Sequence, residues 1–165
     1  MSRVITFARQ FPVTHPKAGQ PTNFLPKIWE SFGEVGHDLK LTQDINLALE
    51  GNWNPKKHTI RSGNRWKKGD MFSPRVWSGR PYCSRQVRIS DDKELHEVWD
   101  IEIDIAGDSS IVRLEGKYLS RGGIERLAEN DGLSYEEFKA WFNKPLFTGQ
   151  VLVWDKSIKL EDYVG

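Results

Sequence analysis

The chain has 165 residues, a length typical of one domain, and its 24 basic against 23 acidic side chains leave a net charge of +1. The single cysteine, Cys83, excludes an internal disulfide framework, and no run approaches the roughly 18 apolar residues that span a bilayer. The first residues also lack the pattern of a secretory signal peptide. We therefore expect one domain over residues 1–165, in the cytoplasm and without a membrane partner.

The first 63 residues are expected to hold one strand and two helices. Residues 4–11 are rich in β-branched and aromatic side chains and predict a first strand. After a proline-punctuated loop, apolar spacing predicts a helix over 23–32 and another over 41–49, closed by Gly51. Residues 53–63 are polar and interrupted by glycine and proline, so we expect a loop there.

Strands are predicted in the middle of the chain, at 71–78 and 82–90. Residues 97–105 alternate apolar and polar side chains, the pattern of a strand with one buried face. A turn at Gly107 leads into 111–119, so these two segments predict a hairpin.

Two helices and a strand are expected to close the chain. An apolar stripe predicts a helix that ends at Asp131–Gly132, and the next helix begins with a capping box made by Ser134 and Glu137. A last strand is expected over 147–154, before a weakly structured acidic tail. This order predicts an α+β fold, namely a small, mostly antiparallel β-barrel with appended helices and an N-terminal helical insertion.

Basic charge is concentrated in residues 53–88, which carry ten Lys or Arg and one acid, a net charge of +9. Aromatic residues lie among these charges, including Trp66, Trp77 and Tyr82. Because cations attract phosphates and aromatic rings stack on bases, the mixture indicates a nucleic-acid or nucleotide partner. The alternative is a solvated basic loop whose aromatic residues belong to the core.

Signatures of metal and cofactor sites are missing from the sequence. The four histidines are scattered without metal-ligand spacing, and there is no glycine-rich phosphate loop, so we expect no metal and no cofactor. Each histidine is interpreted as a surface or structural group, with His58 the best candidate for a ligand because it lies in the basic run. Cys83 has no nearby histidine to activate it and is interpreted as a half-buried strand residue.

Lys56, Thr59 and Arg61 form the pattern Lys-x-x-Thr-x-Arg, followed by a Lys-Gly-Asp turn at 68–70 and a strand. This pattern resembles the Gly-x-Lys-x-x-Thr-x-Arg signature of the activating-signal-cointegrator homology (ASCH) domain, with Asn54 in place of the leading glycine. The resemblance covers roughly residues 50–154 and the first strand. It implies a pseudouridine-synthase-like (PUA-like) β-barrel, and it leaves residues 12–50 as an insertion between the first strand and the motif.

One bacterial branch of that family removes the acetyl group from N(4)-acetylcytidine with a Lys, a Thr and a Glu. The resemblance places these roles on Lys56, Thr59 and Asp131, with Glu129 as the fallback for the acid. Thr59 would be the nucleophile, and Lys56 its base if neighbouring cations and desolvation lower its pKa. An aspartate is one methylene shorter than the family's glutamate, which matters where geometry is sensitive to ~1 Å.

The leading prediction is therefore RNA or modified-nucleoside binding beside this motif. The alternatives are an amidohydrolase acting on an acylated cytidine, a ribonuclease, which no histidine pair supports, and a protein-binding adaptor that uses the 12–50 insertion. An exposed apolar patch at Phe24, Ile28 and Trp29 would favour the adaptor. Ligand contacts are expected from Lys57, Arg61, Arg65, Trp66, Lys67, Lys68, Trp77 and Tyr82.

Overall fold

The computed structural model describes residues 2–165, and the contacts within it divide the chain into two compact units. Unit 1 contains the chain up to Lys56 and the segment Asp70–Glu94. Unit 2 contains Lys57–Gly69 and Leu95–Gly165. The chain therefore passes from one unit to the other three times, and the single domain over 1–165 stays a prediction.

Unit 1 contains a four-stranded sheet in which β3 pairs with β1 in parallel and with β4 and β5 antiparallel. Phe72 and Val76 of β3 are buried, and Val76 lies opposite the buried Val87 of β4. The predicted strand at 71–78 is thus confirmed, whereas the one predicted over 82–90 is reduced to three residues. The strand bounds are β1 Arg3–Phe7, β3 Met71–Trp77, β4 Gln86–Arg88 and β5 Lys93–Glu94.

The helices of unit 1 are α1 (Phe24–Phe32), a short 3-10 helix η1 (Leu39–Leu41) and α2 (Thr42–Glu50). Both α-helices were predicted, but only α1 has a buried face. Its Trp29 is buried and donates a hydrogen bond from Nε1 to the carbonyl oxygen of Ile89, 2.8 Å away. Phe24 and Ile28 are buried too, so the apolar patch that the adaptor prediction needs is part of the core.

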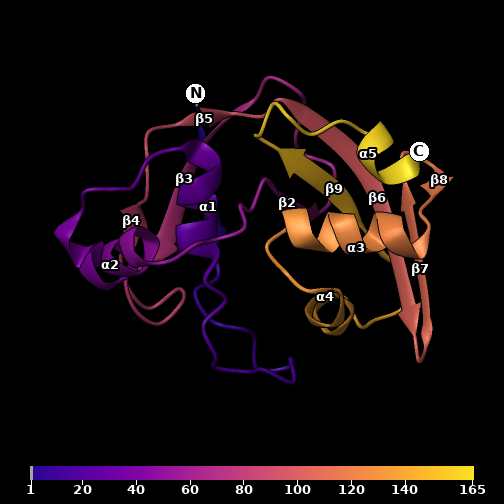
Figure 1. The fold of residues 1–165 in the computed structure, drawn as a ribbon, viewed down its shortest axis with the longest axis horizontal. Helices are drawn as coiled ribbons and strands as arrows, with labels where there is room; N and C mark the ends of the chain where they lie inside the picture. Colours follow the sequence, from indigo (N-terminus) through magenta and orange to yellow (C-terminus); the bar gives the residue numbers. More distant parts are fainter. Residues whose placement is uncertain (1) are drawn as a thin grey trace. The chain divides into compact units, whose positions relative to one another are not determined.

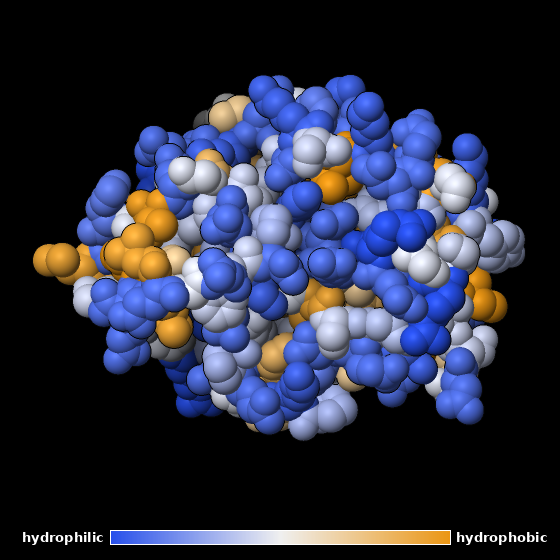
Figure 2. Space-filling model, in the orientation of Figure 1, coloured by the Kyte–Doolittle hydropathy of each residue, from blue (hydrophilic) through white to orange (hydrophobic). Residues whose placement is uncertain are grey.

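Helix α2 buries none of its side chains. The sequence predicts that Leu41, Ile45 and Leu49 share a buried face, but only Leu41 is buried, and Leu49 is 69% exposed. Figure 2 shows the apolar side chains of this part of unit 1 at the surface.

Unit 2 contains a five-stranded antiparallel sheet in the order β2-β9-β6-β7-β8 (Figure 1). In β6 the side chains of Trp99, Ile101 and Ile103 are buried, while Asp100 and Asp104 between and beyond them are exposed, as the alternation predicts. The bounds are β2 His58–Ser62, β9 Phe147–Val153, β6 Glu97–Ala106, β7 Ser109–Leu114 and β8 Lys117–Tyr118.

Three helices complete unit 2: α3 (Arg121–Asn130), α4 (Tyr135–Trp141) and α5 (Glu161–Val164). Figure 1 shows α3 in front of the sheet. The capping box of α4 is present, because the Ser134 hydroxyl accepts from the N–H of Glu137 and the Glu137 carboxylate accepts from the N–H of Ser134. Leu133 and Phe138, which flank it, are both buried.

The predictions and the fold differ at four further places. The first strand ends at Phe7, and the segment predicted over 111–119 is broken into β7 and β8 by a turn at Glu115 and Gly116, both with positive φ. Strand β2 lies where a loop was expected, and the acidic tail forms α5 with a buried tyrosine. The α+β class is confirmed, although strand pairing over residues 2–165 gives two sheets and no closed ring.

Candidate functional site

The basic run of the predicted motif forms β2, the edge strand of the unit 2 sheet. It pairs antiparallel with β9, so that His58 lies opposite Val153 and Thr59 opposite Leu152. Successive side chains of a strand point to opposite faces, which places His58 on one face and Thr59 on the other. Both side chains are buried, at 0% and 4% exposure. A strand that buries polar groups on two faces lacks the alternation by which strands are recognised in a sequence.

His58 is the centre of a buried hydrogen-bond network. Its Nδ1 lies 3.1 Å from Oδ1 of Asp131, and its Nε2 lies 2.8 Å from the hydroxyl oxygen of Tyr163. The Asn130 amide donates to the same hydroxyl oxygen at 2.8 Å. His58, Asp131 and Tyr163 are each at most 4% exposed. The predicted acid, Asp131, is therefore bonded to His58, which lies between Lys56 and Thr59 in the sequence. His58 in turn contacts Tyr163 of the C-terminal helix α5.

The direction of these hydrogen bonds follows from counting protons. Asn130 donates to Tyr163, so the tyrosine proton needs an acceptor, and Nε2 of His58 is its partner among the described residues. That leaves the histidine proton on Nδ1, from which it is donated to the Asp131 carboxylate. With this tautomer, each hydrogen bond of the chain has one donor and one acceptor. Burial also raises the pKa of the Tyr163 phenol, so that it remains the donor at neutral pH.

The end of α3 places Asp131. Its backbone N–H donates to the carbonyl oxygens of Leu127 and Ala128, and Gly132 follows with φ of 86°. Glycine is favoured there because other residues are strained in the left-handed region. The N–H of Lys57 donates to the carbonyl oxygen of Asn130 at 2.7 Å, so that the start of β2 is tied to the helix end that carries the acid.

Thr59 and Arg61 share a face of β2. Nε of Arg61 donates to Oγ1 of Thr59 at 3.2 Å. Because the guanidinium occupies one lone pair of the hydroxyl oxygen, the hydroxyl proton is directed to another acceptor. A neighbouring positive charge also favours the deprotonated form of an oxygen nucleophile. The Thr-x-Arg part of the motif is therefore one unit, built by the period-two geometry of the strand.

Lys56 is the last residue of unit 1, three positions before Thr59 along the chain. Its N–H donates to the carbonyl oxygen of Lys27 at 2.9 Å, and its ammonium lies 4.4 Å from the ring centre of Phe24. At 2% exposure it is a rare buried lysine. The Lys56 ammonium therefore lies over an aromatic face and is shielded from solvent.

The other predicted contacts differ in their exposure and in the unit to which they belong. Trp66 is buried, and its backbone exchanges two hydrogen bonds with the Gln150 side chain, so it belongs to the core. Arg65 and Lys67 are exposed, as is Lys68, which pairs with Glu97 at 3.0 Å. The remaining contacts are Lys57, which is half-buried, and in unit 1 the half-buried Trp77 and the exposed Tyr82.

Two further predictions, for Glu129 and Cys83, can be compared with the structure. The fallback acid Glu129 is exposed, unlike Asp131. Cys83 is exposed in a loop, which corrects its interpretation as a strand residue. In the described part of the chain, no helix could cross a membrane and no three His, Cys, Asp or Glu side chains are grouped to hold a metal ion.

Sequence reasoning missed Tyr163 and Asn130. Tyr163 lies 104 positions after Thr59, in a tail whose acidic composition indicates a solvated segment. The available signal was weak: an aromatic residue followed by valine at the end of a charged stretch.

No protein family, curated protein or solved structure matches the chain.

Proposed function

We propose that the protein is an ASCH-like domain of PUA-like barrel type that binds RNA or a modified nucleoside through residues 56–61. The observation that carries the proposal is the burial of the motif residues Lys56 and Thr59, at 2% and 4% exposure, together with His58 between them at 0%. Burying polar groups costs free energy, and apolar residues would stabilise a core better. A functional role explains why the chain retains them.

These groups suit a base or a nucleoside. The Thr59 hydroxyl and the Arg61 guanidinium, which share one face of β2, offer directional donors and an acceptor of the kind that recognise the edges of a base. The exposed cations Arg65 and Lys67 suit phosphates, since surface charges bind them with little orientation. A nucleoside held by the buried groups and phosphates held by the exposed ones together fit an RNA nucleotide.

Calorimetric titration with cytidine and N(4)-acetylcytidine tests the proposal. Thr59→Ala is expected to weaken binding about tenfold, the effect of losing one ligand hydrogen bond worth about 1.4 kcal/mol. The matched control is Ser73→Ala, which removes the same kind of hydroxyl–arginine pair from β3. Equal affinity in wild type and Thr59→Ala, or equal losses in both variants, would contradict the role of Thr59.

The ionic strength separates the two forms of this proposal. Binding of an uncharged nucleoside should change little between 50 and 200 mM salt, whereas binding of RNA should weaken steeply because counterions are released. A ligand whose affinity does not change with the salt concentration therefore binds at the buried groups alone.

A second function, amide hydrolysis of an acylated cytidine, is favoured by the Arg61 guanidinium, whose Nε donates to Oγ1 of the proposed nucleophile Thr59 at 3.2 Å. In this reaction Thr59 Oγ1 attacks the acyl carbon, and its proton passes to the neutral amine of Lys56, the base that the resemblance implies. The carbon–nitrogen bond then breaks as this proton is transferred to the departing cytidine amine. Water then hydrolyses the threonine ester, so that one water proton returns to Thr59 Oγ1 and acetate is released. Asp131 is bonded to His58, whose side chain lies on the other face of β2 from Thr59, so the acid role that the resemblance gives Asp131 stays a prediction.

Release of cytidine from N(4)-acetylcytidine tests this reaction. Thr59→Ala and Lys56→Ala are each expected to lower kcat at least 1,000-fold, while Lys117→Ala, an exposed change on β8, keeps the wild-type rate. Turnover that survives both motif variants would exclude this mechanism and leave the binding function standing.

A further inference from the structure

The β3–β4 hairpin of unit 1 has two different faces. Val76 and Val87 lie opposite one another on the buried face. On the other face Arg75 lies opposite Arg88, and Trp77 lies opposite Gln86. We call these four residues the outer face of the hairpin. It contains no aliphatic side chain, and its side chains are half-buried or exposed.

The charge on this face is one-sided. Arg75 and Arg88 are directly opposite each other, an arrangement that destabilises a sheet unless an anion lies nearby. Arg88 pairs with Asp92, but within residues 2–165 the Arg75 guanidinium forms hydrogen bonds only to neutral groups, donating to Ser73 Oγ at 3.2 Å and to Gln86 Oε1 at 3.3 Å. Residues 75–88 contain four arginines and no acid. Within residues 2–165, Asp92 is thus the one carboxylate that pairs with an arginine of this segment, whose charge is +4.

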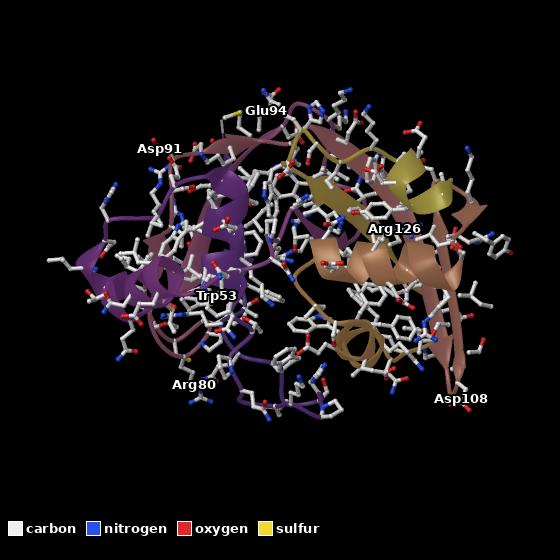
Figure 3. All side chains as sticks on the ribbon, in the orientation of Figure 1. Trp53, Arg80, Asp91, Glu94, Asp108 and Arg126 are labelled. Carbon is white, nitrogen blue, oxygen red and sulfur yellow. The ribbon has the colours of Figure 1, made fainter. Side chains whose placement is uncertain are left out.

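The loop between the strands adds two exposed arginines, Arg80 and Arg85. Neither forms an ion pair with any residue in the described range 2–165, and Figure 3 shows Arg80 directed away from the ribbon. An arginine without a carboxylate keeps its planar donor group available for a phosphate.

Tyr82 of the loop and Trp77 at the end of β3 form an aromatic pair. Tyr82 is 86% exposed, and its ring centre lies 5.1 Å from that of Trp77, with the ring planes at 48°. Tyr82 has φ of 63°, a conformation that is strained for a bulky residue. Hydrogen bonds inside the loop hold it there, including Ser78 N–H to Arg85 carbonyl at 2.8 Å and Ser84 hydroxyl to Arg80 carbonyl at 2.7 Å.

We propose that the outer face and its loop bind single-stranded nucleic acid. Bases stack on Tyr82 and Trp77, and phosphates lie against the arginines of the loop and of β3. Exposed aromatic faces beside unpaired guanidiniums fit a strand of bases and phosphates better than an acidic peptide, which has no ring to stack. This surface extends the proposed function from one nucleoside to a strand, and it rests on that function only in taking the ligand to be nucleic acid.

Fluorescence anisotropy with fluorescein-labelled dodecauridylate tests the arginines. In the double variant Arg80→Ala/Arg85→Ala, the slope of log K against log salt is expected to fall by about 1.4, because each lost phosphate contact removes about 0.7 for a single strand. The control is Lys156→Ala/Lys159→Ala, which removes two exposed charges from the C-terminal tail and should keep the slope. No binding by the wild type, or equal slopes in all three proteins, would overturn the proposal.

Tyr82 separates stacking from charge. Tyr82→Ala is expected to weaken dodecauridylate binding by roughly 5- to 100-fold at an unchanged salt slope, and Tyr82→Phe should restore most of the affinity because it keeps the ring. If Tyr82→Phe binds dodecauridylate as weakly as Tyr82→Ala, the loss of affinity comes from a change in the loop backbone, and stacking is contradicted. Competition by polyglutamate as effective as by unlabelled dodecauridylate would identify an acidic protein partner and overturn the nucleic-acid assignment.

The outcome is independent of the nucleoside site. Calorimetry with N(4)-acetylcytidine on the hairpin variants should give the wild-type affinity. If the variants bind the nucleoside normally and the oligonucleotide normally, the hairpin proposal alone fails. If Thr59→Ala binds both ligands normally, the proposed nucleoside site alone fails.

Discussion

Strands β2 and β3 carry the same local arrangement in different surroundings. In β2 the Arg61 guanidinium donates to the Thr59 hydroxyl, and in β3 the Arg75 guanidinium donates to the Ser73 hydroxyl, both from Nε at 3.2 Å. The nearby carboxylates differ. Asp131, bonded to His58 of β2, has a side-chain exposure of 6%, whereas Asp92, bonded to Arg88 of β4, has 31%.

The comparison shows that contact geometry does not by itself set the energy of a polar network. Water can replace a lost partner of Asp92, so its ion pair contributes little to stability. The groups around His58 are shielded from solvent, and every buried side-chain nitrogen and oxygen over residues 2–165 has a hydrogen-bond partner. Removing one partner from the buried network therefore leaves another group with a desolvation penalty.

The largest effect is expected from His58→Leu. The substitution leaves the Asp131 carboxylate and the Tyr163 hydroxyl buried without their shared partner, and should lower the free energy of unfolding by about 3 kcal/mol. Urea denaturation followed by tryptophan fluorescence measures it. The counterpart in unit 1, Arg88→Ala, should leave the curve unchanged; equal losses would mean that burial does not distinguish the two networks.

Tyr163→Phe tests the outer link of the buried network. It keeps the ring against Trp99 but removes the hydroxyl that His58 and Asn130 share, and should cost about 1 to 2 kcal/mol. Tyr118→Phe is the matched control, because Tyr118 is 69% exposed on β8. An unchanged midpoint in Tyr163→Phe would show that the hydroxyl has no net stabilising role.

The alkaline limb of stability probes the same residue without changing it. Burial raises the pKa of Tyr163, so the folded protein holds this proton more tightly than the unfolded chain. Its contribution is fully present below the unfolded pKa of about 10 and is lost as the pH rises through the folded value. Absorbance at 295 nm should show one of the four tyrosines ionising late, and Tyr163→Phe should lose that step.

The smallest effect is expected at Asp92. A hydrogen bond from the Ser2 hydroxyl, and then the Arg88 guanidinium, hold the pKa of Asp92 below its usual value. A lowered pKa stabilises the fold above the unfolded value of about 3.9, and that contribution is lost as the pH falls through the folded value. In a carbon-detected NMR titration, Ser2→Ala should raise the Asp92 pKa, and the acid limb of stability should shift only slightly.

Much of the fold follows from local sequence. The alternation of 97–105 gives β6, the apolar stripe of 23–32 gives α1, and Ser134 with Glu137 starts α4, because each pattern fits one backbone period or one cap. Lys56, Thr59 and Asp131 were also identified as candidates from the sequence. The sequence did not predict that these three residues are buried, because lysine, threonine and aspartate are usually exposed.

Tertiary structure decided what local patterns could not. Residues 58–62 form a strand because β9, about 90 positions later, offers a ladder of hydrogen bonds, and a polar sequence can then be buried on both faces. Tyr163 reaches His58 only because α5 returns to unit 2, a contact between residues 105 positions apart. The sequence by itself determined which polar side chains the chain contains. Contacts between residues far apart in the sequence decided which of these side chains are buried together.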